Sequence, residues 1–260
     1  MEGVFTVLGP NEPDINVEYD KLAKQANGGN AASMYSLATM CLKHRGTLKD
    51  SGKTSEETAI IWLTKAAEKG HVKAHTLLGI LYEDGLGVSQ NYKMAFQLYS
   101  KAASQGDSWA ECNIGLLYEN GRGVMKDYNE AVRWYKKSAN GGNSDGQVNL
   151  GSYYIGGNSV EVQTGIQWYE KAADNGHIEA MNRLGLIYDT GSLVPKDTKR
   201  AFEWFKMAAQ AGHTDGMYNV AICYAEGTTL DGKQDVAKAK FWIKNAADRG
   251  HQDAQNVVWR

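Results

Sequence analysis

The chain has 260 residues, a formal net charge of −2, a 42% share of hydrophobic residues and only three prolines. This composition excludes a disordered chain and favours a well-packed protein. The near-neutral charge gives no overall attraction to nucleic acid, so we expect no nucleic-acid partner. Because the sequence holds no run of 18 apolar residues, we also expect no direct insertion into a membrane.

The first predicted element is a short helix, Tyr19–Ala26, in an N-terminal capping segment of residues 18–30. It follows an extension of residues 1–17 and looks like the second helix of a pair that lacks its first. The extension carries the acidic Glu2 and a very short apolar run, a pattern that is not typical of a signal peptide. We therefore expect a cytoplasmic protein, or a periplasmic one if a signal peptide has been removed.

A repeated pattern follows over residues 31–251. Its core is Lys-Ala-Ala-x-x-Gly, then a small residue four positions later, then Leu-Gly-x-x-Tyr. The small residue recurs at intervals of 34 to 41 residues, as Ser33, Ala74, Ala110, Gly146, Ala180, Gly216 and Ala254. A period in the range of about 20–50 residues predicts a solenoid, in which each unit buries its apolar face against its neighbours.

The copy at residues 108–143 shows how each unit folds. Apolar residues such as Ala110 and Ile114 have helical spacing, and Gly121-Arg122-Gly123 ends that helix. A second helix is expected from about Asp127 until the next glycine pair. The sequence thus predicts an all-α fold, an α/α superhelical solenoid of about six helix-hairpin repeats with capping helices at both ends. The C-terminal cap is the truncated helix of residues 252–260.

Residues that recur in step with the repeat are expected to support the fold. On this interpretation His71, His177, His213 and His251 fill an equivalent place between repeats, and the Gly-x-Gly segments are turns. Five recurring tryptophans, Trp62, Trp134, Trp168, Trp204 and Trp242, are expected in the core, with lysines beside them on the outer surface. Cys41, Cys112 and Cys223 lie far apart, so we expect small buried thiols. No catalytic residue, metal site or cofactor is predicted.

Several stretches resemble the Sel-one-like repeat family, a relative of the tetratricopeptide repeats. They are AHTLLGILYEDGLG from Ala74, WYKKSA from Trp134 and WYEKAADNG from Trp168, and the resemblance covers about residues 18–260. It implies a non-enzymatic scaffold that binds a partner protein or peptide on its concave face, as a bacterial adaptor or regulatory protein. The alternative is an immunity protein that neutralises a cognate secreted antibacterial effector of the type VI secretion type. A hydrolase with a site in the concave groove is a remote alternative.

In the related arrays the residue before each small residue faces the concave surface, and here it varies between repeats. The series is Ala32, Lys73, Trp109, Asp145, Glu179, Asp215 and Asp253. Its last four members would form a negative stripe that attracts a basic segment of a partner. The alternative is that they are ordinary acidic residues at helix starts, where the helix dipole favours them.

Two further sets complete the predicted partner-binding face. Trp109, flanked by Tyr35 and Lys73, is a candidate anchor for a partner, or else it fills a gap between repeats. One helical turn along, a polar row can pair with the main chain of an extended peptide, or its members bond between neighbouring helices. That row is Asn113, Asn149, Arg183 and Asn219. The sequence does not predict the oligomeric state.

Overall fold

The computed structural model describes residues 15–43 and 53–257, and these form helices joined by short turns, without a strand among them. Residues 45–56 of the first repeat, which the sequence predicts to form an enlarged loop, lie mostly outside the described residues. The helices are α1 (Ile15–Asn27), α2 (Ala31–Lys43), α3 (Ser55–Glu68), α4 (Val72–Asp84), α5 (Tyr92–Ala103), α6 (Ser108–Asn120), α7 (Tyr128–Asn140), α8 (Ser144–Ile155), α9 (Ser159–Asp174), α10 (Ile178–Thr190), α11 (Thr198–Gln210), α12 (Thr214–Glu226), α13 (Val236–Asp248) and α14 (Gln252–Gln255). The predicted all-α solenoid is confirmed.

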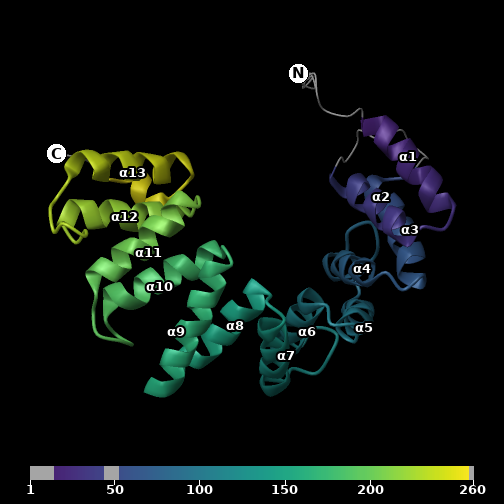
Figure 1. Cartoon of the computed structure of the whole chain (residues 1–260), viewed down its shortest axis with the longest axis horizontal. Coiled ribbons are helices and arrows are strands. Elements are labelled where there is room, and N and C mark those ends of the chain that lie inside the picture. Colours follow the sequence, from purple (N-terminus) through teal and green to yellow (C-terminus); the bar gives the residue numbers. More distant parts are fainter. Residues whose placement is uncertain (1–14, 44–52, 258–260) are drawn as a thin grey trace. The chain divides into compact units, whose positions relative to one another are not determined.

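The chain divides into two compact units, one up to Ala131 and one from Val132. In the first unit, each helix from α1 to α5 packs on the helix that follows it. In the second unit, the same holds for each helix from α8 to α13, and Figure 1 shows α12 beside α13. This order of packing is typical of a solenoid, in which each repeat contacts only the neighbouring repeats.

The Gly-x-Gly segments are turns, as predicted. Gly85 ends α4 in the left-handed conformation, with φ of 71°. Gly87 has φ of 72°, and a Cβ atom at this position would lie 2.7 Å from the Cβ atom of Glu56. Both the backbone angle and the close approach of α3, the second helix of the preceding repeat, therefore require glycine here.

Two small residues on each first helix contact two different neighbours. A Cβ atom at Gly216 of α12 would lie 2.9 Å from Ala208 of α11, in the preceding repeat. A Cβ atom at Gly185 of α10 would lie 2.4 Å from the ring of Phe205, which belongs to α11 of the same repeat. The first small residue thus brings successive repeats together, and the second makes room for an aromatic ring.

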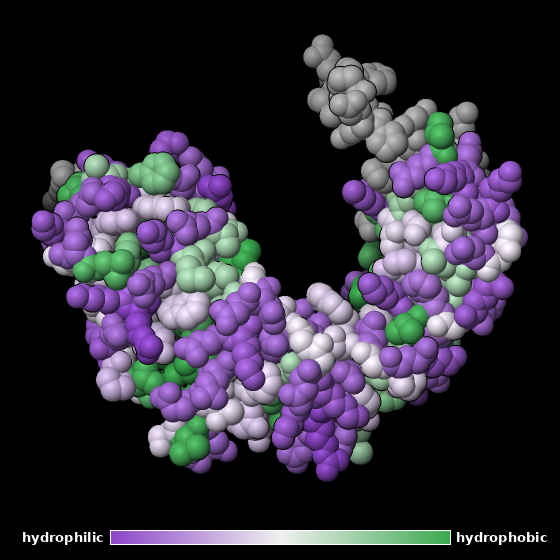
Figure 2. Space-filling model, viewed as in Figure 1, coloured by the Kyte–Doolittle hydropathy of each residue, from purple (hydrophilic) through white to green (hydrophobic). Residues whose placement is uncertain are grey.

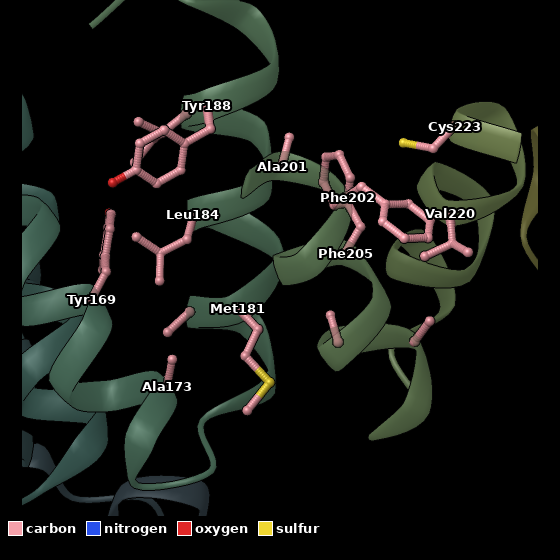
Figure 3. Packing of buried hydrophobic residues seen from close by; sticks show 14 of the residues in the cluster. Tyr169, Ala173, Met181, Leu184, Tyr188, Ala201, Phe202, Phe205, Val220 and Cys223 are labelled. Atoms are coloured by element: carbon pink, nitrogen blue, oxygen red, sulfur yellow. The ribbon is translucent and has the colours of Figure 1, made fainter. Parts of the chain in front are cut away.

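The core of the second unit consists of the side chains between these helices. Figure 3 shows Leu184 of α10 beside Tyr169 of α9, and Phe205 of α11 next to Val220 of α12. Cys223 lies in this core, and all three cysteines are buried free thiols, as predicted. On the face shown in Figure 2, hydrophobic residues form separate patches among hydrophilic ones, because most apolar side chains are used inside the repeats.

The recurring tryptophans are less buried than predicted. All five are half-buried, and the residue after each tryptophan is the buried one: Leu63, Tyr135, Tyr169, Phe205 and Ile243. The exposed lysine three residues later covers the outer side of the ring in three repeats. The distance from Nζ to the ring centre is 3.9 Å for Lys137 over Trp134, 4.0 Å for Lys171 over Trp168 and 4.6 Å for Lys65 over Trp62. The tryptophans therefore line the boundary between core and solvent.

Candidate partner-binding site

The recurring histidines fix the start of each first helix. In His213 the Nδ1 atom accepts a hydrogen bond of 3.1 Å from the backbone N–H of Gly216. His71, His177 and His251 cap their helices in the same way. Since a backbone N–H can only donate, Nδ1 carries no hydrogen, and in the neutral ring the hydrogen lies on Nε2. The predicted structural role of these histidines is confirmed.

The free Nε2–H of three cap histidines points to an acidic residue of the preceding repeat. His177 Nε2 lies 3.1 Å from Asp145 Oδ1, and His213 Nε2 lies 2.9 Å from Glu179 Oε2. His251 Nε2 lies 3.7 Å from Asp215 Oδ1. Asp145 and Glu179 thus connect successive first helices by hydrogen bonds, and Asp215 lies near the next cap histidine. Asp253 of α14 is exposed and follows the last of these histidines.

Glu179 has a second partner within its own helix. Arg183 Nε donates to Glu179 Oε1 at 2.7 Å, and Arg183 Nη1 lies 3.2 Å from Ser152 Oγ of α8. Burial alone would raise the pKa of Glu179, but the hydrogen bonds from Arg183 and His213 outweigh it and lower the pKa below its usual value. Glu179 is therefore ionised near neutral pH and engaged on both oxygens.

The polar row one turn along is also used inside the array. Asn219 Nδ2 donates to Asn182 Oδ1 at 3.1 Å, from α12 to α10. Arg183 bonds to Glu179 as described above, while Asn113 and Asn149 are half-buried. For Asn219 and Arg183 the geometry matches the alternative in which these side chains bond between neighbouring helices.

The other predicted residues line one pocket in the first unit. Tyr35 of α2, Lys73 of α4 and Trp109 of α6 surround a hollow of about 310 Å³. Its remaining lining is Thr76, Leu77, Ile80 and Asp107. Three consecutive first helices supply these side chains, and the predicted grouping of Trp109, Tyr35 and Lys73 is what the structure displays. A volume near 300 Å³ is at the lower end of the range for ligand pockets.

Trp109 stands out among the equivalent residues because it is both aromatic and exposed. Its side chain is 58% accessible, whereas the tryptophans of the second helices are half-buried. On the opposite side of the pocket, the Tyr35 ring stacks on His71 with the centres 4.7 Å apart. Burial and the nearby Asp107 raise the pKa of Tyr35, so its phenol stays protonated at neutral pH.

Thr76 is a polar group of the pocket that the sequence did not reveal. Its side chain is buried, 7% accessible, and its Oγ1 has no hydrogen-bond partner. A threonine inside a helix commonly bonds to the carbonyl four residues earlier, but this one does not. Leaving a buried hydroxyl unpaired costs about 1–3 kcal/mol. The sequence gives no signal for it, because a helical threonine normally satisfies itself locally.

A second hollow, of about 490 Å³, lies in the second unit along α9 and α11. Its lining mixes Glu170 and Glu203 with Arg200 and Lys206, and Arg200 already donates to the Tyr188 hydroxyl at 3.2 Å. None of the predicted site residues lines it. We therefore take the smaller pocket at Trp109 as the candidate site, although the other is larger.

Residues 15–43 and 53–257 lack two further features. No helix there is long and apolar enough to span a bilayer. No group of three or more His, Cys, Asp or Glu side chains is placed to hold a metal ion.

Six successive segments match the Sel1 repeat family: residues 31–71, 72–107, 110–143, 144–177, 178–213 and 214–251. The chain therefore belongs to the family of Sel1 repeat proteins, which are part of the tetratricopeptide-like superfamily. Arrays of this kind are in general scaffolds for protein–protein interaction. A comparison with curated proteins gives no significant match.

Solved structures agree with this assignment. A protective antigen of uropathogenic Escherichia coli with a Sel1-like repeat fold is 30% identical, with a TM-score of 0.76, over 91% of this chain and 50% of the antigen. This chain thus spans about half of the antigen's length. A Sel1 repeat protein from Oxalobacter formigenes is 30% identical, with a TM-score of 0.66, over 94% of this chain and 86% of that one. An immunity protein from Pseudomonas aeruginosa shares the fold, with 20% identity and a TM-score of 0.54, over 94% of this chain and 85% of that one.

Proposed function

We propose that the chain is a non-enzymatic adaptor or regulatory scaffold that binds a partner protein on the face of its first helices, with Trp109 as the anchor. The carrying observation is that an exposed tryptophan, Tyr35 and Lys73 come from three consecutive first helices and line one pocket. Tryptophan is enriched among residues that dominate binding energy at interfaces. When a partner covers the exposed Trp109 ring, the burial would stabilise the complex by about 25 cal/mol for each Å² of apolar surface removed from water.

A non-catalytic role is supported by the chemistry of the pocket. Its titratable groups are Tyr35, Lys73 and Asp107. General acid–base catalysis at neutral pH calls for groups whose pKa is shifted toward 7, whereas the pKa of Tyr35 is shifted upward, away from it. One oxygen of Asp107 also has a structural role, since Oδ1 accepts from the backbone N–H of Ala110 at 2.8 Å.

The alternative is that the chain is an immunity protein for a secreted antibacterial effector. The immunity protein from Pseudomonas aeruginosa supports it through the shared fold alone. Both roles use the same recognition face, so they differ in the partner and not in the site. A toxin encoded beside this gene and neutralised by the chain would decide for immunity, whereas a signalling or envelope protein would decide for the adaptor.

The experiment is capture of the partner from the native cell with the tagged protein, followed by mass spectrometry. Wild type is compared with Trp109→Ala and with the control Phe241→Ala. Phe241 of α13 is 60% accessible, so the control substitution removes an aromatic ring from the other unit that is about as exposed as Trp109. We expect one dominant partner that is lost with Trp109→Ala and retained with Phe241→Ala. Equal capture by both variants, or no specific partner for wild type, would overturn the proposal.

The acidic residues receive a separate test, because the sequence predicts that they attract a basic segment of the partner. Asp215→Lys with Asp253→Lys reverses the charge of the two most C-terminal carboxylates of the row, and Asp215 is only 3.7 Å from its histidine. If a basic segment contacts them, capture weakens and depends on salt. Unchanged capture at low salt would show that the negative stripe does not contact the partner. It would not affect the proposal that Trp109 does.

A further inference from the structure

The Trp109 pocket contains polar groups that have no partner within the described chain. Thr76 belongs to the pocket lining, and its Oγ1 is buried and has no hydrogen-bond partner. Lys73 lies in the same lining, is exposed, and forms no ion pair among the described residues. Both side chains can donate hydrogen bonds. The α4 wall of the pocket therefore carries two hydrogen-bond donors that have no acceptor among the described residues.

The facing wall from α6 has the opposite character. Asp107 uses Oδ1 to cap α6, and its second carboxylate oxygen is available as an acceptor. Between these walls lie the apolar side chains of Leu77 and Ile80, and Trp109 closes one side. The pocket thus offers donors on one wall, an acceptor on the other, and an apolar surface between them.

We propose, resting on the recognition role above, that this pocket takes one bulky apolar side chain of a partner's extended segment together with its flanking peptide group. A peptide group has one acceptor and one donor, which match Lys73 and Thr76 on one wall and Asp107 on the other. The apolar side chain packs on Leu77, Ile80 and the Trp109 ring. A free carboxylate fits this arrangement less well, because the Asp107 carboxylate lies in the same lining.

The test uses blocked pentapeptides, Gly-Ser-Xaa-Ser-Gly, acetylated at the N-terminus and amidated at the C-terminus, with Leu, Phe, Ala or Glu at Xaa. Binding is followed by NMR through the indole N–H signal of Trp109, which is identified by its loss in Trp109→Phe. We expect saturable shifts for Leu and Phe, with a Kd on the order of 1 mM for a single anchor, and no saturable shift for Ala or Glu. Absence of binding by every peptide would overturn the proposal.

The Thr76→Val variant separates a binding role of the hydroxyl from a structural one. Valine keeps the shape and removes the unpaired hydroxyl, so the free protein should unfold at the same or a higher temperature. Affinity for the Leu peptide should fall about two- to tenfold, the value of one hydrogen bond. The matched control is Thr164→Val in α9, whose hydroxyl is satisfied by the carbonyl of Val160 at 3.1 Å. An unchanged affinity in Thr76→Val would contradict the proposed contact.

Two other occupants would be recognised in the same experiment. Tighter binding of a peptide with a free C-terminal carboxylate would replace the peptide-group assignment with carboxylate recognition. An indole shift that depends on protein concentration without peptide would identify a second copy of the chain as the occupant. If the peptides bind as expected but no partner is captured from the cell, the pocket chemistry stands and the adaptor role fails. If capture depends on Trp109 and no peptide binds, the recognition role stands and the proposed pocket chemistry fails.

Discussion

At the scale of single residues, one histidine position does two jobs in this chain. Its Nδ1 caps a first helix, and Nε2 hydrogen-bonds to a carboxylate at the start of the preceding first helix in two cases and lies 3.7 Å from one in a third. Asp107 and Asn143 occupy the equivalent position in other repeats and cap with a side-chain oxygen. The position therefore requires an acceptor for the helix start, and histidine adds a link to the preceding repeat.

This account predicts different outcomes for two substitutions of His213. His213→Ala removes the cap and the contact with Glu179, so it should lower the free energy of unfolding by about 1 kcal/mol. His213→Asn keeps a side-chain oxygen that can cap the helix, as Asn143 does. It should therefore lower the free energy of unfolding by only a few tenths of a kcal/mol. Urea unfolding of the two variants measures the difference. Equal losses for alanine and asparagine would show that the cap is not the stabilising contact.

A pH effect follows for His71. Burial, then the nearby charges of Lys73 and His75, lower the pKa of His71 below its usual value, and the cap needs Nδ1 without a hydrogen. Below about pH 6.5 the unfolded chain therefore binds a proton more readily than the folded chain, so stability falls as pH decreases through this range. Wild type should lose stability relative to His71→Asn between pH 7.5 and pH 5.5 in urea unfolding. A difference that stays constant over this range would contradict the assignment.

The candidate site was predictable from the sequence only where repeats could be compared. Trp109 differs from its equivalents, and that difference points to the pocket that the structure displays. The engagement of Asp145 and Glu179 by cap histidines was not predicted, because it depends on which atom of the next repeat lies within 3.1 Å and 2.9 Å. Thr76 was missed for the same reason, since only three-dimensional packing shows that its hydroxyl lacks a partner.

At the scale of helices, spacing and glycines predicted the hairpins well. The helix expected to start near Asp127 is α7, which starts at Tyr128, and Gly121 ends α6 in the left-handed conformation as expected. The degree of burial along one helix was harder to predict. Trp204 and Phe205 are adjacent aromatic residues, and only the geometry of α11 on α10 shows that the second is the buried one.

The second small position of each first helix gives a prediction for the hairpin. Gly185→Ala places a methyl group 2.4 Å from the Phe205 ring, so overpacking should cost about 1–3 kcal/mol despite the better helix propensity of alanine. Phe205→Leu makes space at the same contact. In urea unfolding, the double variant Gly185→Ala with Phe205→Leu should lose less than the sum of the two single losses. Strict additivity would mean that the glycine is not needed for this contact.

At the scale of the whole molecule, six Sel1 repeats are arranged in two compact units with different chemistry on their first helices. In the second unit, carboxylates and cap histidines connect successive repeats. In the first unit the equivalent residues are Lys73 and Trp109, and the side chains line a pocket with unpaired polar groups. The family assignment explains the scaffold, and the departure from the repeat explains where recognition is proposed.

The most direct test is hydrogen–deuterium exchange of the chain alone and bound to the partner that wild type captures. The account predicts slower exchange on binding in α2, α4 and α6, the helices that supply Tyr35, Thr76 and Trp109. Protection confined to α8–α14, with unchanged exchange in the first unit, would contradict recognition at the Trp109 pocket.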